Sequence, residues 1–218
     1  ISGVQHDVRS FATRLRLRVE AIPNERDRDR AIKDIEDMIR LLDDALLSAR
    51  GAHGSLDAEL IDLAAFLKAD IGDLYRSGLP ACLADLPEGE VPVLADRLAL
   101  KRMVGNLIEN AVKYGERAHV SLAVEGDQAV IRVRDEGPGI APADRLLLLE
   151  PFARGEPSRA RQTGGAGLGL AIVLTEAQGG VIEIVDACGG GEDVKGEDKT
   201  TRFHRGTQVC IRLPLFDA

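Results

Sequence analysis

The 218-residue sequence contains no tryptophan, and aromatic residues make up only 3% of the chain. Its core must therefore be aliphatic, and a platform of stacked aromatic rings for single-stranded nucleic acid is not expected. Positive charge is also in short supply, because 28 Lys and Arg are outnumbered by 36 Asp and Glu, which gives a net charge of −8. An acidic chain is a poor general binder of phosphate backbones, so we expect no nucleic-acid partner.

Cysteines and long apolar runs are scarce as well. Cys82, Cys188 and Cys210 are far apart and odd in number, which indicates a reducing compartment rather than a disulfide framework. No apolar run approaches the ~18 residues of a membrane span and no signal peptide is visible, so we expect a cytoplasmic chain. Because residue 1 is Ile rather than Met, we expect a fragment or a processed chain. Its missing segments could include an anchor in the inner membrane.

Two amphipathic helices joined by a turn are predicted over residues 1–50. Apolar residues repeat every three or four positions on both sides of Pro23-Asn24, which supplies the turn. Two apolar stripes are more than one hairpin can bury, so we expect a dimeric four-helix bundle. Cover by the rest of the chain is the alternative. The apolar seam of the second helix consists of Ile32, Ile35, Ile39, Leu42, Leu46 and Ala49.

Residues 51–55 have the composition of a linker, and the pattern beyond them predicts an α+β two-layer sandwich over residues 56–218. Asp96 is a candidate cap for one of its helices. The Gly-rich, charged stretch 188–206 is expected to form a long hairpin loop. Helices are expected over residues 60–75, 97–114 and 168–178, and strands over 91–95, 119–126, 128–135, 181–187 and 208–214.

Two glycine-bearing strings are candidates for ligand contact. In DEGPGI (135–140), a carboxylate at the end of a strand can accept a hydrogen bond from an exocyclic amine such as adenine N6, and two glycines permit close backbone approach. GGAGLGLAIV (164–173) leads from glycines directly into a helix, whose first N–H groups form an anion site. Each string on its own could equally be an ordinary turn or an ordinary helix start.

Polar side chains also gather on one face of a predicted helix. In NLIENAVKYG (106–115), Asn106, Asn110 and Lys113 are spaced i, i+4 and i+7. Asparagine offers a hard oxygen ligand of the kind that Mg²⁺ prefers, although a polar stripe facing solvent is the alternative. Between the two glycine strings, residues 141–163 show few regular signals, which is typical of a lid over a site or of disorder.

Taken in order, NLIENAVKYG, DEGPGI, EPFARG and GGAGLGLAI resemble the N, G1, F and G2 boxes of the histidine-kinase catalytic domain, which has the Bergerat-type ATPase fold. The resemblance covers residues from about 56 to 216. It implies ATP and Mg²⁺ as cofactors, with Asn110 coordinating Mg²⁺ and Asn106 lining the same site. It further implies that Lys113 and Arg154 approach the phosphates, that Tyr114 packs by the base, that Asp135 reads adenine N6, and that Gly137, Gly139, Gly165, Gly167, Leu168 and Gly169 shape the pocket.

The N-terminal helix carries a second resemblance, because HDVRS (6–10) is similar to the H box of the dimerisation and phosphotransfer domain. This implies that His6 is the phosphoacceptor, and that Asp7 accepts a proton from the other ring nitrogen and orients the imidazole. Ser10 stands where the family often has a Thr or Asn that orients the water for dephosphorylation of a regulator. Phe11 replaces the usual Pro, so the helix kink after the H box is expected to be absent.

The two resemblances together imply the core of a sensor histidine kinase of a two-component system. Such a homodimer autophosphorylates His6 with ATP and passes the phosphoryl group to an aspartate in the receiver domain of a response regulator. Phosphatase activity toward that regulator is a further expectation. One alternative is a nucleotide-binding dimeric scaffold without turnover, which Asn106, Asn110 and Asp135 disfavour only weakly. The other is a Ser/Thr-directed kinase of the anti-sigma type, which the H box disfavours.

Overall fold

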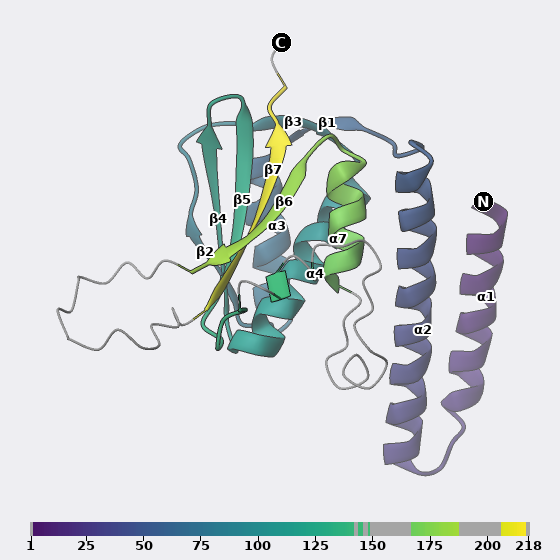
Figure 1. Ribbon diagram of the computed structural model, residues 1–218. Helices are drawn as coiled ribbons and strands as arrows, with labels where there is room; N and C mark the ends of the chain where they lie inside the picture. The colour runs from purple at the N-terminus through teal and green to yellow at the C-terminus, as the bar shows by residue number, and fades with distance from the viewer. Residues whose placement is uncertain (1, 142–143, 146–147, 149–166, 188–205, 217–218) are drawn as a thin grey trace, which may run out of the picture. The chain divides into compact units, whose positions relative to one another are not determined.

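The computed structural model describes residues 2–141, 144–145, 148, 167–187 and 206–216, which form two compact units. Unit 1 spans Ile1–His53 and unit 2 spans Gly54–Ala218 (Figure 1). None of the described helices combines the length and the apolar character that a membrane span requires.

Unit 1 is a helical hairpin of α1 (Ser2–Val19) and α2 (Glu25–Ala52). The predicted turn lies between them, and Asn24 caps α2 by accepting hydrogen bonds from the backbone N–H groups of Arg26 and Asp27 at 3.0 and 3.4 Å. A side-chain oxygen at this position pairs amides that have no partner within the helix. Helix α1 is a single helix through Phe11, as the absence of proline predicts.

The C-terminal end of α2 corrects the expected start of the linker. The helix continues through Gly51 and Ala52, so it occupies part of the 51–55 stretch. It ends at His53, whose backbone N–H donates to the carbonyls of Ala49 and Gly51. Gly54 then adopts a positive φ of 63°, which favours glycine and leads the chain out of the helix.

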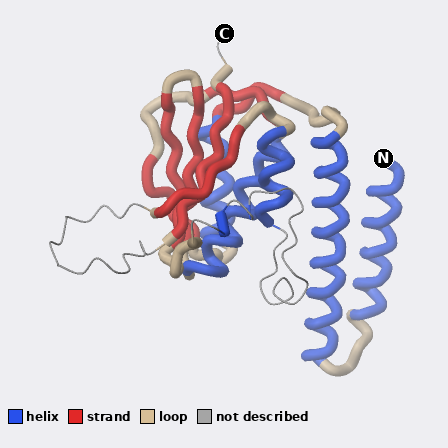
Figure 2. Tube along the Cα trace, in the orientation of Figure 1, coloured by secondary structure: helices blue, strands red, loops and turns tan. Residues whose placement is uncertain are grey.

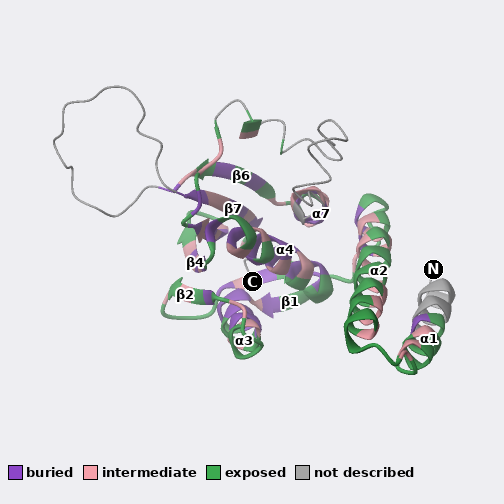
Figure 3. Cartoon of the chain, turned by 90° about the horizontal axis from the view of Figure 1, so that it is seen from below, coloured by how far each residue is buried: buried purple, intermediate pink, exposed green. Residues whose placement is uncertain are grey.

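Apolar side chains of α2 remain open to solvent within the hairpin. Four seam residues (Ile32, Ile35, Ile39 and Leu46) are half-buried, whereas Leu42 is 38% exposed. Figure 3 shows α2 as a helix of mostly exposed and half-buried residues. Leu41, beside the seam, is 60% exposed. One hairpin therefore leaves apolar surface uncovered, and the dimeric bundle stays a prediction.

Unit 2 is an α+β sandwich in which helices cover one face of a five-stranded sheet (Figure 2). The strand order is β2-β4-β5-β7-β6, with β2 and β4 parallel and the other neighbours antiparallel. Strands β1 and β3 form a separate antiparallel pair. This confirms the predicted α+β class. The elements are β1 (Glu59–Asp62), α3 (Leu63–Arg76), β2 (Ala81–Asp85), β3 (Pro92–Ala95), α4 (Arg97–Gly115), β4 (Ala118–Glu125), β5 (Gln128–Asp135), α7 (Gly167–Glu176), β6 (Val181–Asp186) and β7 (Thr207–Pro214).

Strands β1 and β2 were not predicted, and β1 occupies the start of the expected helix 60–75. The boundary is set by Asp62, whose Oδ1 accepts from the backbone N–H groups of Ala64 at 3.1 Å and Val91 at 3.0 Å. One carboxylate oxygen thereby caps α3 and holds the chain that leads into β3. The helix begins at Leu63 because its cap stands there. Most of the expected 188–206 loop lies outside the described residues.

The described core between sheet and helices is aliphatic, as the composition predicts, with Phe66 as its one buried aromatic side chain. Helix α4 lies at the centre of this layer and packs against β4, β5 and α7 (Figure 1). Its start is capped by Asp96, which accepts from the N–H groups of Leu98 and Ala99. The backbone N–H of Asp96 in turn donates to Gln178 beyond the end of α7, at 3.0 Å. These bonds cap the start of α4 and join it to the segment that follows α7.

Candidate functional site

Asp135 ends β5 and is buried, with 9% of its surface exposed. Its Oδ1 accepts hydrogen bonds from the backbone N–H groups of Gly137 at 2.8 Å and Thr207 at 2.9 Å. No described residue donates to Oδ2. A buried carboxylate that is held through one oxygen offers the other, in a fixed direction, to a ligand group that donates a hydrogen bond.

Glycines bring the end of α4 against this carboxylate. A Cβ atom at Gly115 would lie 2.6 Å from Cβ of Asp135 and 2.7 Å from the backbone nitrogen of Gly137. A Cβ atom at Gly137 would lie 2.6 Å from the carbonyl oxygen of Tyr114. Only residues without a side chain allow such an approach. The NLIENAVKYG and DEGPGI strings, which are separate in the sequence, therefore meet in the fold.

The predicted side chains of α4 follow one face of the helix toward this junction. Asn106 is buried and its Nδ2 has no hydrogen-bond partner among the described residues. Asn110, one turn further on, is half-buried. Lys113 and Tyr114 are exposed at the end of the helix, where Nζ of Lys113 lies 5.1 Å from the centre of the Tyr114 ring. Burial thus decreases along the face from Asn106 to Tyr114.

Helix α7 borders α4 and contains three of the predicted residues. Gly167 is its first residue, and Leu168 and Gly169 are half-buried. Arg154 and Gly165 lie outside the described residues. Gly139 of the DEGPGI string is half-buried with a φ of +83°, which is a conformation that favours glycine.

The predicted phosphotransfer residues belong to unit 1. His6 and Asp7 lie within α1, and Ser10 is an exposed residue of the same helix. The structure therefore brings Asp135 and the end of α4 together in unit 2, where α7 packs beside α4. The H-box residues belong to α1 of unit 1.

Two residues of the site were missed because they belong to no box of the resemblance. The N–H of Thr207 holds Asp135, and Gly206 has a φ of +108°. A Cβ atom at Gly206 would lie 2.2 Å from the carbonyl oxygen of Asp135, so only glycine fits here. A glycine two residues before the predicted strand 208–214 was the available signal, but its partner Asp135 lies far away in the sequence.

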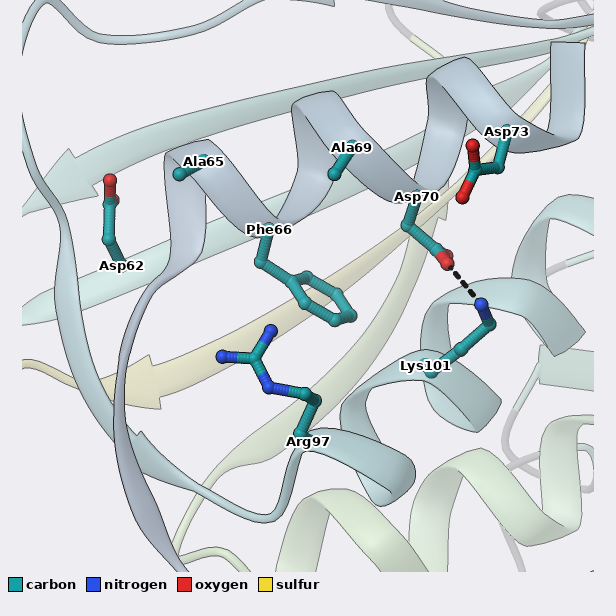
Figure 4. A pocket seen from close by; sticks show the side chains of 8 residues that line it. All are labelled: Asp62, Ala65, Phe66, Ala69, Asp70, Asp73, Arg97 and Lys101. Carbon is teal, nitrogen blue, oxygen red and sulfur yellow. Dashed lines mark ion pairs between the residues drawn. The ribbon is translucent and has the colours of Figure 1, made fainter. Parts of the chain in front are cut away.

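A pocket of about 390 Å³ lies elsewhere, between α3 and the first turns of α4 (Figure 4). It is lined in part by Phe66, Asp70 and Asp73 of α3 and by Arg97 and Lys101 of α4. Asp70, which is buried, is paired with Nζ of Lys101 at 3.1 Å. The pocket contains none of the predicted site residues and is lined from the opposite end of α4, so we do not assign the nucleotide to it.

Comparisons with known proteins agree with the fold and with the family resemblance. The family model described as histidine kinase-, DNA gyrase B-, and HSP90-like ATPase matches residues 95–217. The sensor histidine kinase GtrS of Pseudomonas aeruginosa is 35% identical over 98% of this chain, and the sensor protein RstB of Escherichia coli is 35% identical over 84%. The chain spans 41% and 44% of the length of these two relatives.

Solved structures show the same fold. The crystal structure of full-length ShkA in complex with AMPPNP matches the whole chain with a TM-score of 0.67 at 22% identity. The match covers 46% of the ShkA chain. Acinetobacter baumannii histidine kinase AdeS matches 97% of the chain, and 98% of its own, with a TM-score of 0.62 at 22% identity. The predicted resemblance is thereby confirmed, and the chain belongs to the family of histidine kinase-, DNA gyrase B- and HSP90-like ATPases.

Proposed function

We propose that the chain is the catalytic core of a protein-histidine kinase, which transfers the γ-phosphoryl group of ATP to His6 and then to an aspartate of a response-regulator receiver domain. The observation that carries this proposal is the extent of the match to GtrS, which covers 98% of the chain and so includes both the hairpin and the ATPase unit. The family model alone, which matches residues 95–217, does not distinguish kinases from the other ATPases that it describes.

Adenine recognition is assigned to Asp135. Its Oδ1 is occupied by two backbone amides, so Oδ2 is the atom that can accept from a ligand. A carboxylate only accepts, and adenine presents an amino group at C6 where guanine presents a carbonyl oxygen. The geometry therefore favours ATP over GTP. The pocket around the nucleotide is proposed to be shaped by Gly137, Gly139, Gly165, Gly167, Leu168 and Gly169.

The phosphate end is assigned to the polar face of α4. Buried Asn106 has an amide nitrogen without a partner among the described residues, so its carboxamide has capacity for a ligand group or for water. Asn110 would hold Mg²⁺ through its amide oxygen, and the ion supplies charge neutralisation for phosphoryl transfer. Lys113 and Arg154 add positive charge toward the phosphates, and Tyr114 packs by the base.

The phosphoacceptor is assigned to the H box. A neutral imidazole of His6 has a nitrogen lone pair for attack on the γ-phosphorus, while Asp7 accepts the proton of the other ring nitrogen and orients the ring. Phosphoryl transfer makes small demands on covalent chemistry and large ones on position. The exposed apolar residues of α2 suit a homodimeric four-helix bundle that would present the two His6 residues. Attachment to a membrane is proposed only for segments beyond this chain.

The proposal is tested by incubating the chain with ATP labelled at the γ-phosphate and with Mg²⁺. We expect a label that is labile in acid and stable in alkali, which is typical of phosphohistidine. His6→Gln should abolish the label and leave ATP affinity unchanged, because His6 belongs to unit 1 and the nucleotide residues to unit 2. His53→Gln, at the end of α2, is the matched control and should be labelled normally. Label that persists in His6→Gln would contradict the assignment.

A further inference from the structure

Cys82, His119 and Glu136 form a chain of hydrogen bonds on the face of the sheet that the helices leave uncovered. Strands β2 and β4 are parallel and in a register that sets Cys82 beside His119. Sγ of Cys82 lies 3.2 Å from Nδ1 of His119, and Nε2 of His119 lies 2.9 Å from Oε1 of Glu136. The neighbouring residues Ala118 and Val120 of β4 point into the core, so His119 points to the opposite face.

The direction of each hydrogen bond follows from the donor inventory. An ionised Glu136 carboxylate can only accept, so Nε2 of His119 must carry the hydrogen. In the neutral imidazole, Nδ1 then has the lone pair, and it faces the sulfur of Cys82. The thiol of Cys82 is therefore the donor in this contact. A base within reach of a nucleophile, oriented by a third group, is the arrangement that activates nucleophilic side chains.

The arrangement does not suit a metal ion. The two imidazole nitrogens serve partners on opposite sides of the ring, so the three side chains form a line and do not converge on one point. Among the residues that the structure describes, no group of three or more His, Cys, Asp or Glu side chains could hold a metal. Proton transfer is the chemistry that a linear relay supports.

The accessibility of the thiol completes the argument. Cys82 is exposed, and the side chains of His119 and Glu136 are 30% and 56% exposed. Cys210, by contrast, is buried, with 4% of its surface exposed. Its Sγ is contacted by the side-chain amide of Gln208 at 3.4 Å and by no described imidazole. One protein thus contains an accessible thiol beside a base and a buried thiol without one.

We propose that Cys82 is a reactive thiol that is oxidised by hydrogen peroxide, with His119 as its base and Glu136 as the positioning residue. His119 Nδ1 takes the thiol proton, and the thiolate attacks one oxygen of the peroxide. An S–O bond forms, the O–O bond breaks, and sulfur loses two electrons to the departing hydroxide. The imidazolium returns its proton to the hydroxide as water, which leaves a sulfenic acid on Cys82 and a neutral His119. Glu136 is adjacent in the sequence to Asp135 and Gly137 of the proposed nucleotide site, but the reaction at Cys82 uses none of the assigned nucleotide residues and does not depend on kinase activity.

The primary measurement is the alkylation rate of each cysteine in the full chain, determined by peptide mass spectrometry with iodoacetamide at neutral pH. We expect folded Cys82 to react roughly tenfold faster than the same residue in the urea-unfolded chain, because thiolate is the reacting form. Cys210 should react more slowly folded than unfolded, since it is buried. If folding leaves the rate of Cys82 unchanged or lowers it, the proposal is overturned.

Variants separate the base from the positioning residue. His119→Ala should lower the rate at Cys82 by roughly tenfold, because the thiol loses its proton acceptor. Glu136→Ala should lower it less, and Glu136→Gln should recover part of the loss because its amide oxygen still accepts from Nε2. Ser121→Ala, two residues along the same face of β4, is the matched control and should react like the unsubstituted chain. An unchanged rate in His119→Ala would refute the role of the imidazole.

The oxidation step is tested with hydrogen peroxide in the presence of dimedone, which captures sulfenic acids. We expect the adduct on Cys82 and none on Cys210, and a loss of the Cys82 adduct in His119→Ala. Circular dichroism of each variant shows whether the fold is retained. Absence of the adduct on a folded, unsubstituted chain would contradict peroxide as the oxidant.

Discussion

The side chain of Asp135 and the backbone amide of Thr207 are 72 residues apart in the sequence, and a hydrogen bond of 2.9 Å joins them. This bond attaches the start of β7 to the end of β5 beyond the last paired residues of the two strands. Together with the bond from Gly137, it leaves Oδ2 of Asp135 as the only oxygen of the carboxylate that is not held by a described donor. The same residue is thus a structural anchor and the proposed reader of adenine.

Replacing Asp135 by Asn is expected to weaken ATP binding by ~1.5–3 kcal/mol, which is the value of a hydrogen bond to a charged group. In the Asp135→Asn variant the amide oxygen can still accept from the backbone N–H groups, but the amide NH₂ group then faces adenine N6, and both groups are donors. Discrimination between ATP and GTP should fall at the same time. Calorimetric titration with both nucleotides measures this, and Asp127→Asn in the β4–β5 turn is the control. Equal affinity of the unsubstituted chain for ATP and GTP would contradict the assignment.

Replacing Gly115 by Ala is expected to destabilise unit 2. Alanine is worth up to ~1 kcal/mol more than glycine within a helix. The added Cβ would, however, lie 2.7 Å from the backbone nitrogens of Glu136 and Gly137, and overpacking against backbone costs ~1–3 kcal/mol. The clash should outweigh the helix propensity, and ATP affinity should fall because the junction beside Asp135 opens.

Gly105→Ala in the same helix is the matched control for this substitution, because a Cβ there would meet no atom within 4 Å. Helix propensity acts alone at this position, so stability should rise by ~0.5–1 kcal/mol. Urea unfolding of both variants measures the two free energies. If both substitutions changed the free energy of unfolding in the same direction, the close approach at the end of α4 would not restrict residue 115 to glycine.

Local features of the sequence were sufficient for α4 and for the central hairpin of the sheet. The 3.6-residue periodicity and the Asp96 cap predicted α4 to within one residue at its C-terminal end, and alternation predicted β4 and β5. Periodicity, capping and alternation each depend on residues that are close together in the sequence. The box residues Asn106 and Asp135 were likewise proposed from local strings and a family resemblance.

Long-range register could not be predicted in the same way. The pairing of Cys82 with His119 depends on a parallel contact between β2 and β4, and β2 itself is short with little alternation. The contact of Gly206 with Asp135 depends on how β7 is placed next to β5. In each case the order and register of the strands bring two residues together, and the local sequence around one residue does not indicate the other.

The hairpin is expected to dimerise through the seam of α2. Replacing Ile39 and Leu42 by Lys would place two charges on a surface whose burial should contribute ~1.5–3 kcal/mol per side chain. Sedimentation velocity should then show monomers. The control carries Lys at Asp34 and Asp37, which are exposed positions away from the seam, and should remain dimeric. An unsubstituted chain that is monomeric at high micromolar concentration would exclude the bundle.

Ser10 is expected to support dephosphorylation of the partner regulator. It lies four residues after His6 and therefore one turn further along the same face of α1, and it is exposed. A serine hydroxyl both donates and accepts, so it can orient a water molecule for attack on a phospho-aspartate. Helix α1 continues through the neighbouring Phe11, which is 55% exposed, so no proline bend redirects the hydroxyl.

The comparison that decides this role uses Ser10→Ala and Ser10→Thr in two assays. One assay measures autophosphorylation, and the other measures the decay of a receiver domain that the chain itself has phosphorylated. Ser10→Ala should keep the first activity and slow the second, because it removes the hydroxyl and leaves His6 in place. Ser10→Thr should restore the decay or accelerate it, since the added methyl group restricts χ1 and holds the hydroxyl in fewer orientations. Equal decay rates for all three proteins would mean that Ser10 is ordinary helix surface.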